Sequence, residues 1–194
     1  MMFFLYQLLI FITLIFSPII LFVRFLKNKE DKKRFIEKFS IIFKKKNKEN
    51  LVWFHAASVG EVMSIVPLID ELEKDEKIQK ILLTTSTLSS SKIFENLRFK
   101  KTIHQFFPID FFFLTSIFIK HWKPKIAIFI DSEIWPCMFT EIKKNKIPLI
   151  LMNARITERS FKKWQIFKKF SSTIFGKIDK AYPCNLETIN YLKK

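Results

Sequence analysis

A glutamate follows one of the only two glycines in this chain of 194 residues, inside the stretch WFHAASVGEV of residues 53–62. A chain that uses glycine so sparingly is expected to place Gly60 where backbone geometry or the close approach of a ligand excludes a Cβ atom. The carboxylate of Glu61 could act as a general base if it lies within hydrogen-bonding reach of a substrate hydroxyl. An acidic residue in the first turn of a helix is also favoured by the helix dipole. Capping and catalysis therefore both remain open for Glu61.

Two further groups of polar residues come directly after apolar runs. Asp131 and Glu133 form the first group, and Arg155 and Arg159 belong to the second. The carboxylates could steady a developing positive charge or orient a sugar, or one of them could cap a helix. If the chain stays extended there, only one of the two faces the same side as the preceding core residues. The guanidinium groups could receive phosphates or carboxylates, or form surface salt bridges.

Serine, threonine, histidine and cysteine side chains give weaker indications of function. Residues 84–91 form a hydroxyl-rich stretch that could bind sugar or phosphate, although helix capping alone would explain it. His55 is equally suited to supporting its loop and to touching a ligand. Cys137 and Cys184 lack the accompanying histidine pairs of a zinc motif, so no metal site is expected.

Short apolar runs alternate with helically periodic segments after residue 50. This alternation predicts an α/β fold, a Rossmann-like parallel sheet with helices on both faces. In such a sheet the three polar groups lie at the carboxyl ends of strands and line one crevice. The predicted strands are 51–56, 81–85, 103–107, 126–130, 149–152 and a weaker one near 181, and the predicted helices are 62–72, 88–97, 111–122, 136–144, 159–175 and 187–192.

The amino-terminal 26 residues are almost entirely apolar, with no charge before Arg24. About 20 apolar residues suffice to cross a bilayer core, so a membrane-anchor helix is expected here, and Pro18 is compatible with a kinked one. No small-residue cleavage site follows, so a removable signal is not expected. The lysines that come next predict a globular part on the cytoplasmic side. The chain is accordingly divided into an anchor (1–26), a basic linker (27–50) and a domain (51–194).

The formal net charge of +16 asks for an acidic partner or another explanation. The densest lysine cluster, between residues 27 and 48, adjoins the anchor and favours anionic lipid head groups or a phosphorylated lipid. Many lysines could instead simply solubilise the surface. Because the charge is the only feature that suggests nucleic acid, no nucleic-acid partner is expected.

Several short motifs, in this order along the chain, resemble the amino-terminal half of the bacterial 3-deoxy-D-manno-octulosonic acid (Kdo) transferases. That resemblance implies the acceptor-binding domain of an inverting glycosyltransferase of the GT-B type, which transfers Kdo from CMP-Kdo to lipid IVA without a cofactor. It also implies residence on the cytoplasmic face of the inner membrane. The motifs are RFIEKF (34–39), HAASVGE (55–61), TTST (84–87), FPID (107–110), DSEIWP (131–136) and NARITERS (153–160).

The resemblance assigns roles to single residues. Glu61 becomes the base that takes the proton of the acceptor hydroxyl. Asp131 stands where the family has a glutamate regarded as stabilising the transition state. The expected acceptor-binding residues are Ser58, Gly60, Glu133, Arg155 and Arg159.

Other positions depart from the family pattern. Its Pro-Thr-Gly-Ser-Glu loop reads LSSSK at residues 88–92 here, and the donor-binding domain would follow residue 194. We therefore expect the 194 residues alone to be inactive and to work with a separate or attached donor-binding half. The alternative is a membrane-anchored lipid-binding remnant, or a split subunit, that does not catalyse transfer.

Overall fold

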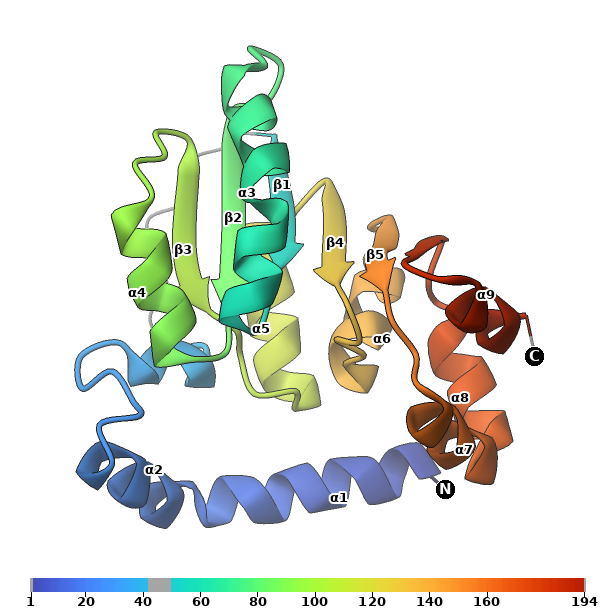
Figure 1. Ribbon diagram of the computed structural model, residues 1–194. Coiled ribbons are helices and arrows are strands. Elements are labelled where there is room, and N and C mark those ends of the chain that lie inside the picture. Colours follow the sequence, from blue (N-terminus) through green and yellow to red (C-terminus); the bar gives the residue numbers. More distant parts are fainter. Residues whose placement is uncertain (1, 42–49, 194) are drawn as a thin grey trace.

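Six parallel strands form one sheet in the computed structural model, which describes residues 2–41 and 50–193 (Figure 1). The strand order is β3-β2-β1-β4-β5-β6, so the direction of the winding reverses between β1 and β4. The predicted α/β fold with a parallel sheet is confirmed. The strands are β1 (Leu51–His55), β2 (Lys80–Thr85), β3 (Thr102–Phe106), β4 (Ile126–Ile130), β5 (Leu149–Ala154) and β6 (Lys180–Pro183).

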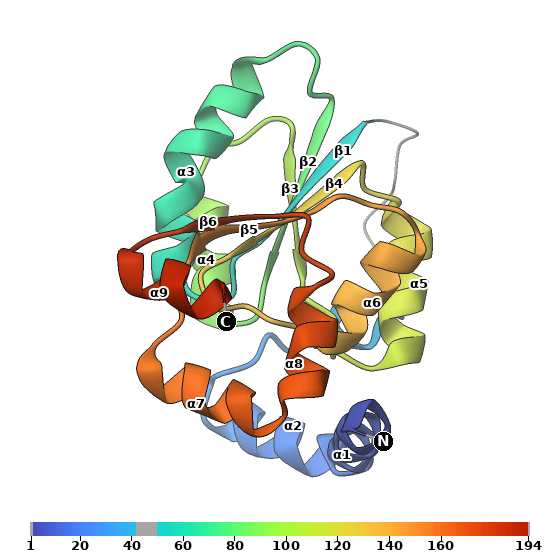
Figure 2. The same ribbon diagram turned by 90° about the vertical axis from the view of Figure 1, so that its right-hand side faces the viewer.

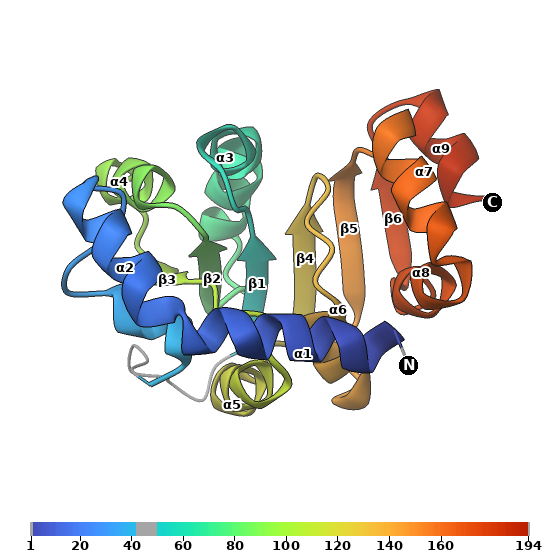
Figure 3. The same cartoon turned by 90° about the horizontal axis from the view of Figure 1, so that it is seen from below.

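Helices cover both faces of the sheet, as Figure 3 shows most clearly. One face carries α3 (Val59–Lys74) and α4 (Leu88–Asn96), and the other carries α5 (Phe112–Trp122) and α6 (Pro136–Lys144). Beyond β5 the chain continues through α7 (Glu158–Ile166), α8 (Lys168–Phe175) and α9 (Leu186–Leu192). Before the sheet come α1 (Met2–Ile15), α2 (Ser17–Leu26) and a 3-10 helix, η1 (Phe35–Phe39).

Each face of the sheet has its own hydrophobic core. Trp53 and Phe129 are fully buried on the face covered by α5 and α6, whereas Phe54 and Leu83 are fully buried on the face covered by α3. Neighbouring side chains of one strand point to opposite faces, and both faces are covered. This arrangement explains why the strands read as continuous apolar runs rather than as an alternating pattern.

The single helix predicted at 159–175 is wrong, because the chain breaks at Phe167 (φ −118°, ψ 49°) between α7 and α8. The side chain of Ser171 lies 3.0 Å from the Trp164 carbonyl oxygen, seven residues back, which a continuous helix would not allow. A serine hydroxyl that bonds to nearby carbonyl groups competes with regular helix geometry. The break leaves Ile166 and Phe167 exposed.

The expected anchor helix over residues 1–26 is two helices, α1 and α2, bent by 57°. Pro18 is the second residue of α2, where its missing N–H group would have no intrahelical partner anyway. Within the described residues, no single helix has the length and apolar character to cross a membrane; the bent pair meets that test by length and composition only.

The basic linker expected over residues 27–50 contains the structured element η1. Arg34 donates to the backbone oxygen of His104 at 3.1 Å, and Glu37 accepts the N–H of Phe106 at 2.8 Å, so η1 packs along the free side of β3. Four of the lysines of that linker, at positions 44, 45, 46 and 48, lie outside the described residues.

Candidate functional site

The carboxyl ends of β1 and β4 lie side by side at the point where the strand order reverses. Trp53 pairs with Ala127 in the register of these two strands. The chain then leaves β1 towards α3 on one face and leaves β4 towards α6 on the other (Figure 3). In open parallel sheets a crevice forms where neighbouring connections diverge in this way, and ligands bind there.

Glu61 occupies the first turn of α3 and forms a reciprocal cap with Ser58. Ser58 is the N-cap residue and donates its hydroxyl to Glu61 Oε1 at 2.6 Å, while its oxygen lies 3.4 Å from the Glu61 backbone nitrogen. The other carboxylate oxygen accepts the backbone N–H of Ala57 at 2.8 Å. This arrangement is a variant of the capping box, because the carboxylate accepts the N–H of Ala57, the residue before the N-cap, rather than that of Ser58 itself. Each oxygen retains a further lone-pair site for a ligand.

The expectation that geometry excludes a side chain at Gly60 is wrong. Gly60 lies in the first turn of α3 without a positive φ, and a Cβ atom there would meet nothing within 4 Å. The residue is exposed beside Glu61. Of the two reasons expected from the sequence, only the close approach of a ligand stays a prediction.

The hydroxyl-rich stretch supports the loop that carries Glu61. Thr87 caps α4 and accepts the Ser90 backbone N–H at 3.2 Å. Ser90 donates its own hydroxyl to the Ala57 carbonyl at 3.0 Å, and both Ser90 and Ser91 are buried. Helix capping, one of the two readings open from the sequence, is therefore what these hydroxyl groups do in the structure.

Asp131 has left-handed backbone geometry, with φ of 60°. Aspartate is among the residues that tolerate this region best. The extended strand therefore ends at Ile130, and the alternation expected for the two carboxylates does not apply. Ser132 lies within hydrogen-bond distance of Asp131 Oδ1, at 3.0 Å, and of the Arg155 carbonyl oxygen. The loops after β4 and β5 are thereby brought together.

Glu133 is held by two aromatic side chains and faces β1. Its Oε2 atom accepts the indole N–H of Trp135 at 2.9 Å and lies 3.3 Å from His55 Nε2. The glutamate side chain is 21% exposed, whereas His55 is fully buried. This contact joins the ends of the two strands that flank the crevice.

His55 is buried beneath the site and supports Glu133, but it does not line the surface of the site. Its Nδ1 atom lies 3.0 Å from the Thr84 hydroxyl, and its ring stacks on Phe107 with centroids 3.9 Å apart. Of the two roles open from the sequence, the buried position favours support. Thr84 also accepts the indole N–H of Trp53 at 2.9 Å, which continues the polar chain into the core.

Arg155 and Arg159 are both exposed at the carboxyl edge beyond β5. Arg155 is tied to the site through its backbone contact with Ser132, and Arg159 lies in the first turn of α7. Ile156, the residue after Arg155, donates its N–H to the Thr188 hydroxyl at 3.0 Å, which fixes the loop after β5 against α9. Both guanidinium groups are available to an anion in solution.

Asp110 is a site residue that the sequence motif contained but to which no role was assigned. It is 1% exposed and accepts the backbone N–H groups of Cys137 and Met138, at 2.9 and 2.8 Å, and the Tyr6 hydroxyl at 2.7 Å. Burial raises the pKa of the Asp110 carboxyl. The available signal was that α6 begins at Trp135-Pro136 without a side-chain cap of its own. In the structure the Asp110 carboxylate supplies that cap.

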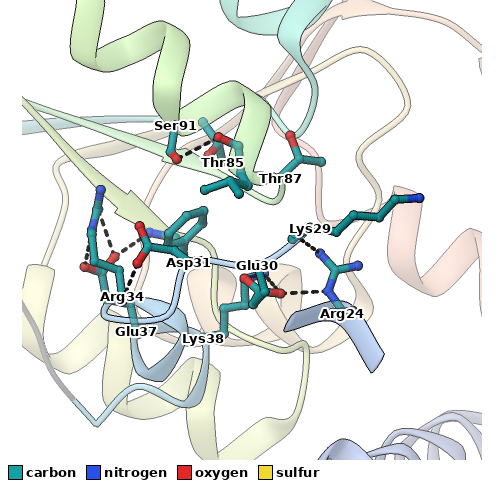
Figure 4. Close-up of polar contacts among 12 residues, drawn as sticks. Arg24, Lys29, Glu30, Asp31, Arg34, Glu37, Lys38, Thr85, Thr87 and Ser91 are labelled. Atoms are coloured by element: carbon teal, nitrogen blue, oxygen red, sulfur yellow. Dashed lines mark hydrogen bonds and ion pairs between the residues drawn. The ribbon is translucent and has the colours of Figure 1, made fainter. Parts of the chain in front are cut away.

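A basic segment with buried carboxylate partners precedes the sheet, as Figure 4 shows for Arg24, Glu30 and Lys38. Buried Glu30 is paired with Arg24 at 2.7 Å and with Lys38 at 2.7 Å. Burial lowers the pKa of Lys38. Two cations around one carboxylate, with exposed Lys29 beside them, leave this segment positively charged.

Comparisons with known proteins agree on one family. The family model described as "3-Deoxy-D-manno-octulosonic-acid transferase (kdotransferase)" matches residues 33–194. A 3-deoxy-D-manno-octulosonic acid transferase of Rickettsia bellii is 40% identical over 170 residues, which are 88% of this chain and 40% of the relative. The protein of that name from Rickettsia typhi is 44% identical over 74% of this chain and 32% of its own length.

A more distant relative carries the same name. The 3-deoxy-D-manno-octulosonic acid transferase of Haemophilus influenzae is 31% identical over 66% of this chain and 30% of its own length. The chain thus spans two fifths or less of the length of these relatives.

Proposed function

This chain belongs to the 3-deoxy-D-manno-octulosonic acid transferase family, and we propose that it is the acceptor-binding half of an enzyme that transfers Kdo to the lipid A precursor. The donor is CMP-Kdo, the acceptor is lipid IVA, and the configuration at the anomeric carbon is inverted. The observation that carries the proposal is the position of Glu61, at the helix start beside the strand-order reversal, with Asp131 and Glu133 on the adjacent strand end.

Glu61 is the base in this proposal. Ser58 and Ala57 hold its two oxygens by donating to them, which fixes the direction of the carboxylate. The carboxylate takes the proton from an acceptor hydroxyl while that oxygen forms a bond to the anomeric carbon and CMP departs. A positioned base of this kind accelerates a reaction by roughly 10²- to 10⁴-fold.

Asp131 and Glu133 assist from the opposite side of the crevice. Asp131 places a carboxylate near the positive charge that develops on the sugar, and its left-handed backbone turns it away from the strand direction. Glu133 is anchored through one oxygen, Oε2, by Trp135 and His55. Its second oxygen is suited to bind an acceptor hydroxyl.

The acceptor is a phosphorylated lipid. Exposed Arg155 and Arg159 lie at the carboxyl edge of the sheet, and exposed Lys27 and Lys29 follow α2, so the chain offers cations to the phosphates of such an acceptor. The apolar helices α1 and α2 are located at the same edge (Figure 1). We therefore infer residence on the cytoplasmic face of the inner membrane, where such a lipid is concentrated.

The test uses a polypeptide that joins this chain to the remaining part of the Rickettsia bellii relative, as the source of a donor-binding half. Glu61→Gln is expected to reduce Kdo transfer by about 10²-fold or more while the unfolding midpoint changes little. The matched control is Glu71→Gln, an exposed glutamate on the same helix, which should transfer at the unaltered rate. Transfer that survives Glu61→Gln would disprove the role of Glu61.

A second candidate is a lipid-binding module that does not catalyse transfer. The capping box favours it, because both oxygens of Glu61 already have structural partners. This candidate predicts that the chain binds phosphorylated lipid A precursor equally well after Glu61→Gln, and that binding weakens with salt. It is excluded if the joined polypeptide transfers Kdo and Glu61→Gln abolishes that transfer.

A further inference from the structure

The carboxyl edge of the sheet carries an extended apolar surface. We call it the apolar platform: the outer faces of α1 and α2, the first turn of α5, and the junction between α7 and α8. Its side chains include Phe4 (73% exposed), Leu26 (68%), Phe113 (58%) and Ile166 (72%). Contiguous exposed apolar surface of this kind marks an interaction site rather than ordinary protein surface.

Helix α1 is apolar nearly all round, yet it uses only one side to contact the protein. Phe3 packs on Phe170 with ring centroids 6.5 Å apart, and Phe11 packs on Phe111 at 6.1 Å. Near its start, Tyr6 donates to buried Asp110. A helix that is apolar on every side needs an apolar neighbour on every side, so its outer face requires a second apolar medium.

The contacts of this segment all lead to the same globular body. They begin at Phe3 and Tyr6, close to the start of the segment, and Phe25 at the end of α2 meets Phe35 with centroids 5.3 Å apart. Figure 3 shows α1 running across the carboxyl edge of the sheet rather than away from it. A segment held at both ends by one side of the domain cannot place its start on the far side of a membrane.

Charges flank the platform at both ends. Lys27, Lys29, Lys32 and Lys33 are exposed just after α2. At the other end, exposed Lys163, Lys168 and Lys169 surround the α7–α8 junction, which the contact of Phe170 with Phe3 places beside the start of α1 (Figure 2). Apolar surface bordered by lysines matches an anionic lipid surface, with acyl chains under the platform and head groups at its margins.

We propose that α1 and α2 lie in the plane of an anionic phospholipid bilayer, inserted only to the depth of the platform, and do not cross it. The proposal rests on the membrane residence inferred above, but makes a separate claim about topology. Asp110 connects the platform to the site, because it binds Tyr6 and also caps α6, which begins directly after Trp135. The bilayer surface is thereby held at the same edge of the sheet as Glu61.

The experiment measures depth along the segment in the full chain. Exposed Cys184 is replaced by Ser, whereas buried Cys137 is kept. Single cysteines are then introduced by Phe4→Cys, Ile12→Cys and Leu26→Cys, with Glu71→Cys on α3 as the water-exposed control. Each is labelled with a fluorophore and mixed with sealed vesicles of phosphatidylglycerol and phosphatidylcholine that contain lipids spin-labelled near the head group or deep in the acyl chain.

The expected result is that all three platform positions are quenched more strongly by the shallow spin label than by the deep one, while the control is quenched by neither. Before labelling, Phe4→Cys should react with an impermeant thiol reagent added outside the vesicles. The variant Lys27→Glu/Lys29→Glu/Lys163→Glu should bind these vesicles at least tenfold more weakly, without a change in its unfolding midpoint.

Three results would overturn the proposal. Deep quenching of Ile12→Cys, together with a Phe4→Cys thiol that reacts only with reagent trapped inside the vesicles, would show a spanning segment and leave membrane residence intact. Failure to bind vesicles would contradict both the in-plane placement of α1 and α2 and the membrane residence. A dimer whose labels are shielded without lipid would show that a second copy covers the platform. Kdo transfer by the joined polypeptide is measured separately, so its failure is distinguishable from each of these.

Discussion

His55 Nε2 lies 3.3 Å from Glu133 Oε2, so the fully buried last residue of β1 meets a carboxylate from the loop that follows β4. The two residues are 78 positions apart in the sequence. Because the contact bridges the strands on either side of the crevice, it couples the position of Glu133 to the rigid sheet. A carboxylate supported in this way is preorganised for a ligand.

Replacing His55 by Ala is expected to loosen this support. The change removes the partner of Glu133 Oε2 and leaves the Thr84 hydroxyl with one contact fewer in a buried place. We expect the free energy of unfolding to fall by about 1–3 kcal/mol, measured by urea denaturation. Trp135→Phe removes the other donor to Glu133 Oε2 together with part of a ring that packs on Phe107, and the lost hydrogen bond alone should cost about 0.5–1.5 kcal/mol. Equal stability of His55→Ala and the parent chain would contradict the supporting role.

Asp110→Asn is expected to destabilise the joint between α1, the β3–α5 loop and α6. The amide offers one acceptor oxygen in place of two, so a backbone N–H of Cys137 or Met138 would face an N–H₂ group. The expected loss is about 1–3 kcal/mol. Tyr6→Phe, which removes only one hydroxyl donor, should cost about 0.5–1.5 kcal/mol. The order of the two losses is the check, and a larger loss for Tyr6→Phe would refute this account of α6 capping.

Ser58→Ala removes the cap of α3 and one of the two donors that hold Glu61. N-cap replacements of this kind cost about 0.5–2 kcal/mol, measured as the change in unfolding free energy. Ser64→Ala is the control, because Ser64 is an exposed residue of the same helix whose hydroxyl bonds only to the Glu61 carbonyl among the contacts of the structure's described part. If both variants lose the same stability, the cap is not the cause.

Stability should decline at acid pH through Glu73. Burial opposes its ionisation, but donors from the Thr102 hydroxyl and from the backbone of Lys101 and Lys100 outweigh it, so the pKa of Glu73 lies below its ordinary 4.5. A carboxyl whose pKa is lower in the folded state stabilises the fold above pH 4.5, and this contribution is lost as the pH falls through the lowered value.

The measurement for Glu73 is the unfolding midpoint between pH 6 and pH 3. Glu73→Gln should flatten the fall in this range, whereas Glu71→Gln, an exposed neighbour, should leave the curve unchanged. A parent chain and a Glu73→Gln variant with the same acid limb would show that other carboxyls govern the decline.

The inner strands could be predicted from the sequence because their apolar runs are buried on both faces, whereas the edge strand β6 is partly exposed and gave a weaker pattern. Residues 126–130 were predicted exactly as β4, and β1 differs from its prediction by one residue. The helix over residues 159–175 was wrong because its break at Phe167 follows from where Ser171 finds a carbonyl partner. Such a contact exists only after the chain has folded back.

The sequence predicted which edge of the sheet holds the candidate site, but it did not predict the contacts within the site. Glu61, Asp131 and Arg155 were placed at strand ends by pattern, and the sheet order brings these ends together. The bond of Glu133 to His55 and the capping of α6 by Asp110 join residues far apart in the chain, so no local spacing encodes them. The geometric reason expected for Gly60 was wrong, because a Cβ atom there would meet nothing within 4 Å, and the space around a residue is known only from the folded chain.

The packing of η1 along β3 has a consequence for the solubility of the protein. An edge strand presents unpaired backbone groups that another chain can use as a template for aggregation. On β3 the outward carbonyl of His104 is taken by Arg34 and the outward N–H of Phe106 by Glu37. The opposite edge, β6, is only four residues long, starts at Lys180 and ends at Pro183, both of which discourage strand addition. Both edge strands of this phenylalanine-rich protein are thus protected from pairing with another chain and from polymerisation by strand addition.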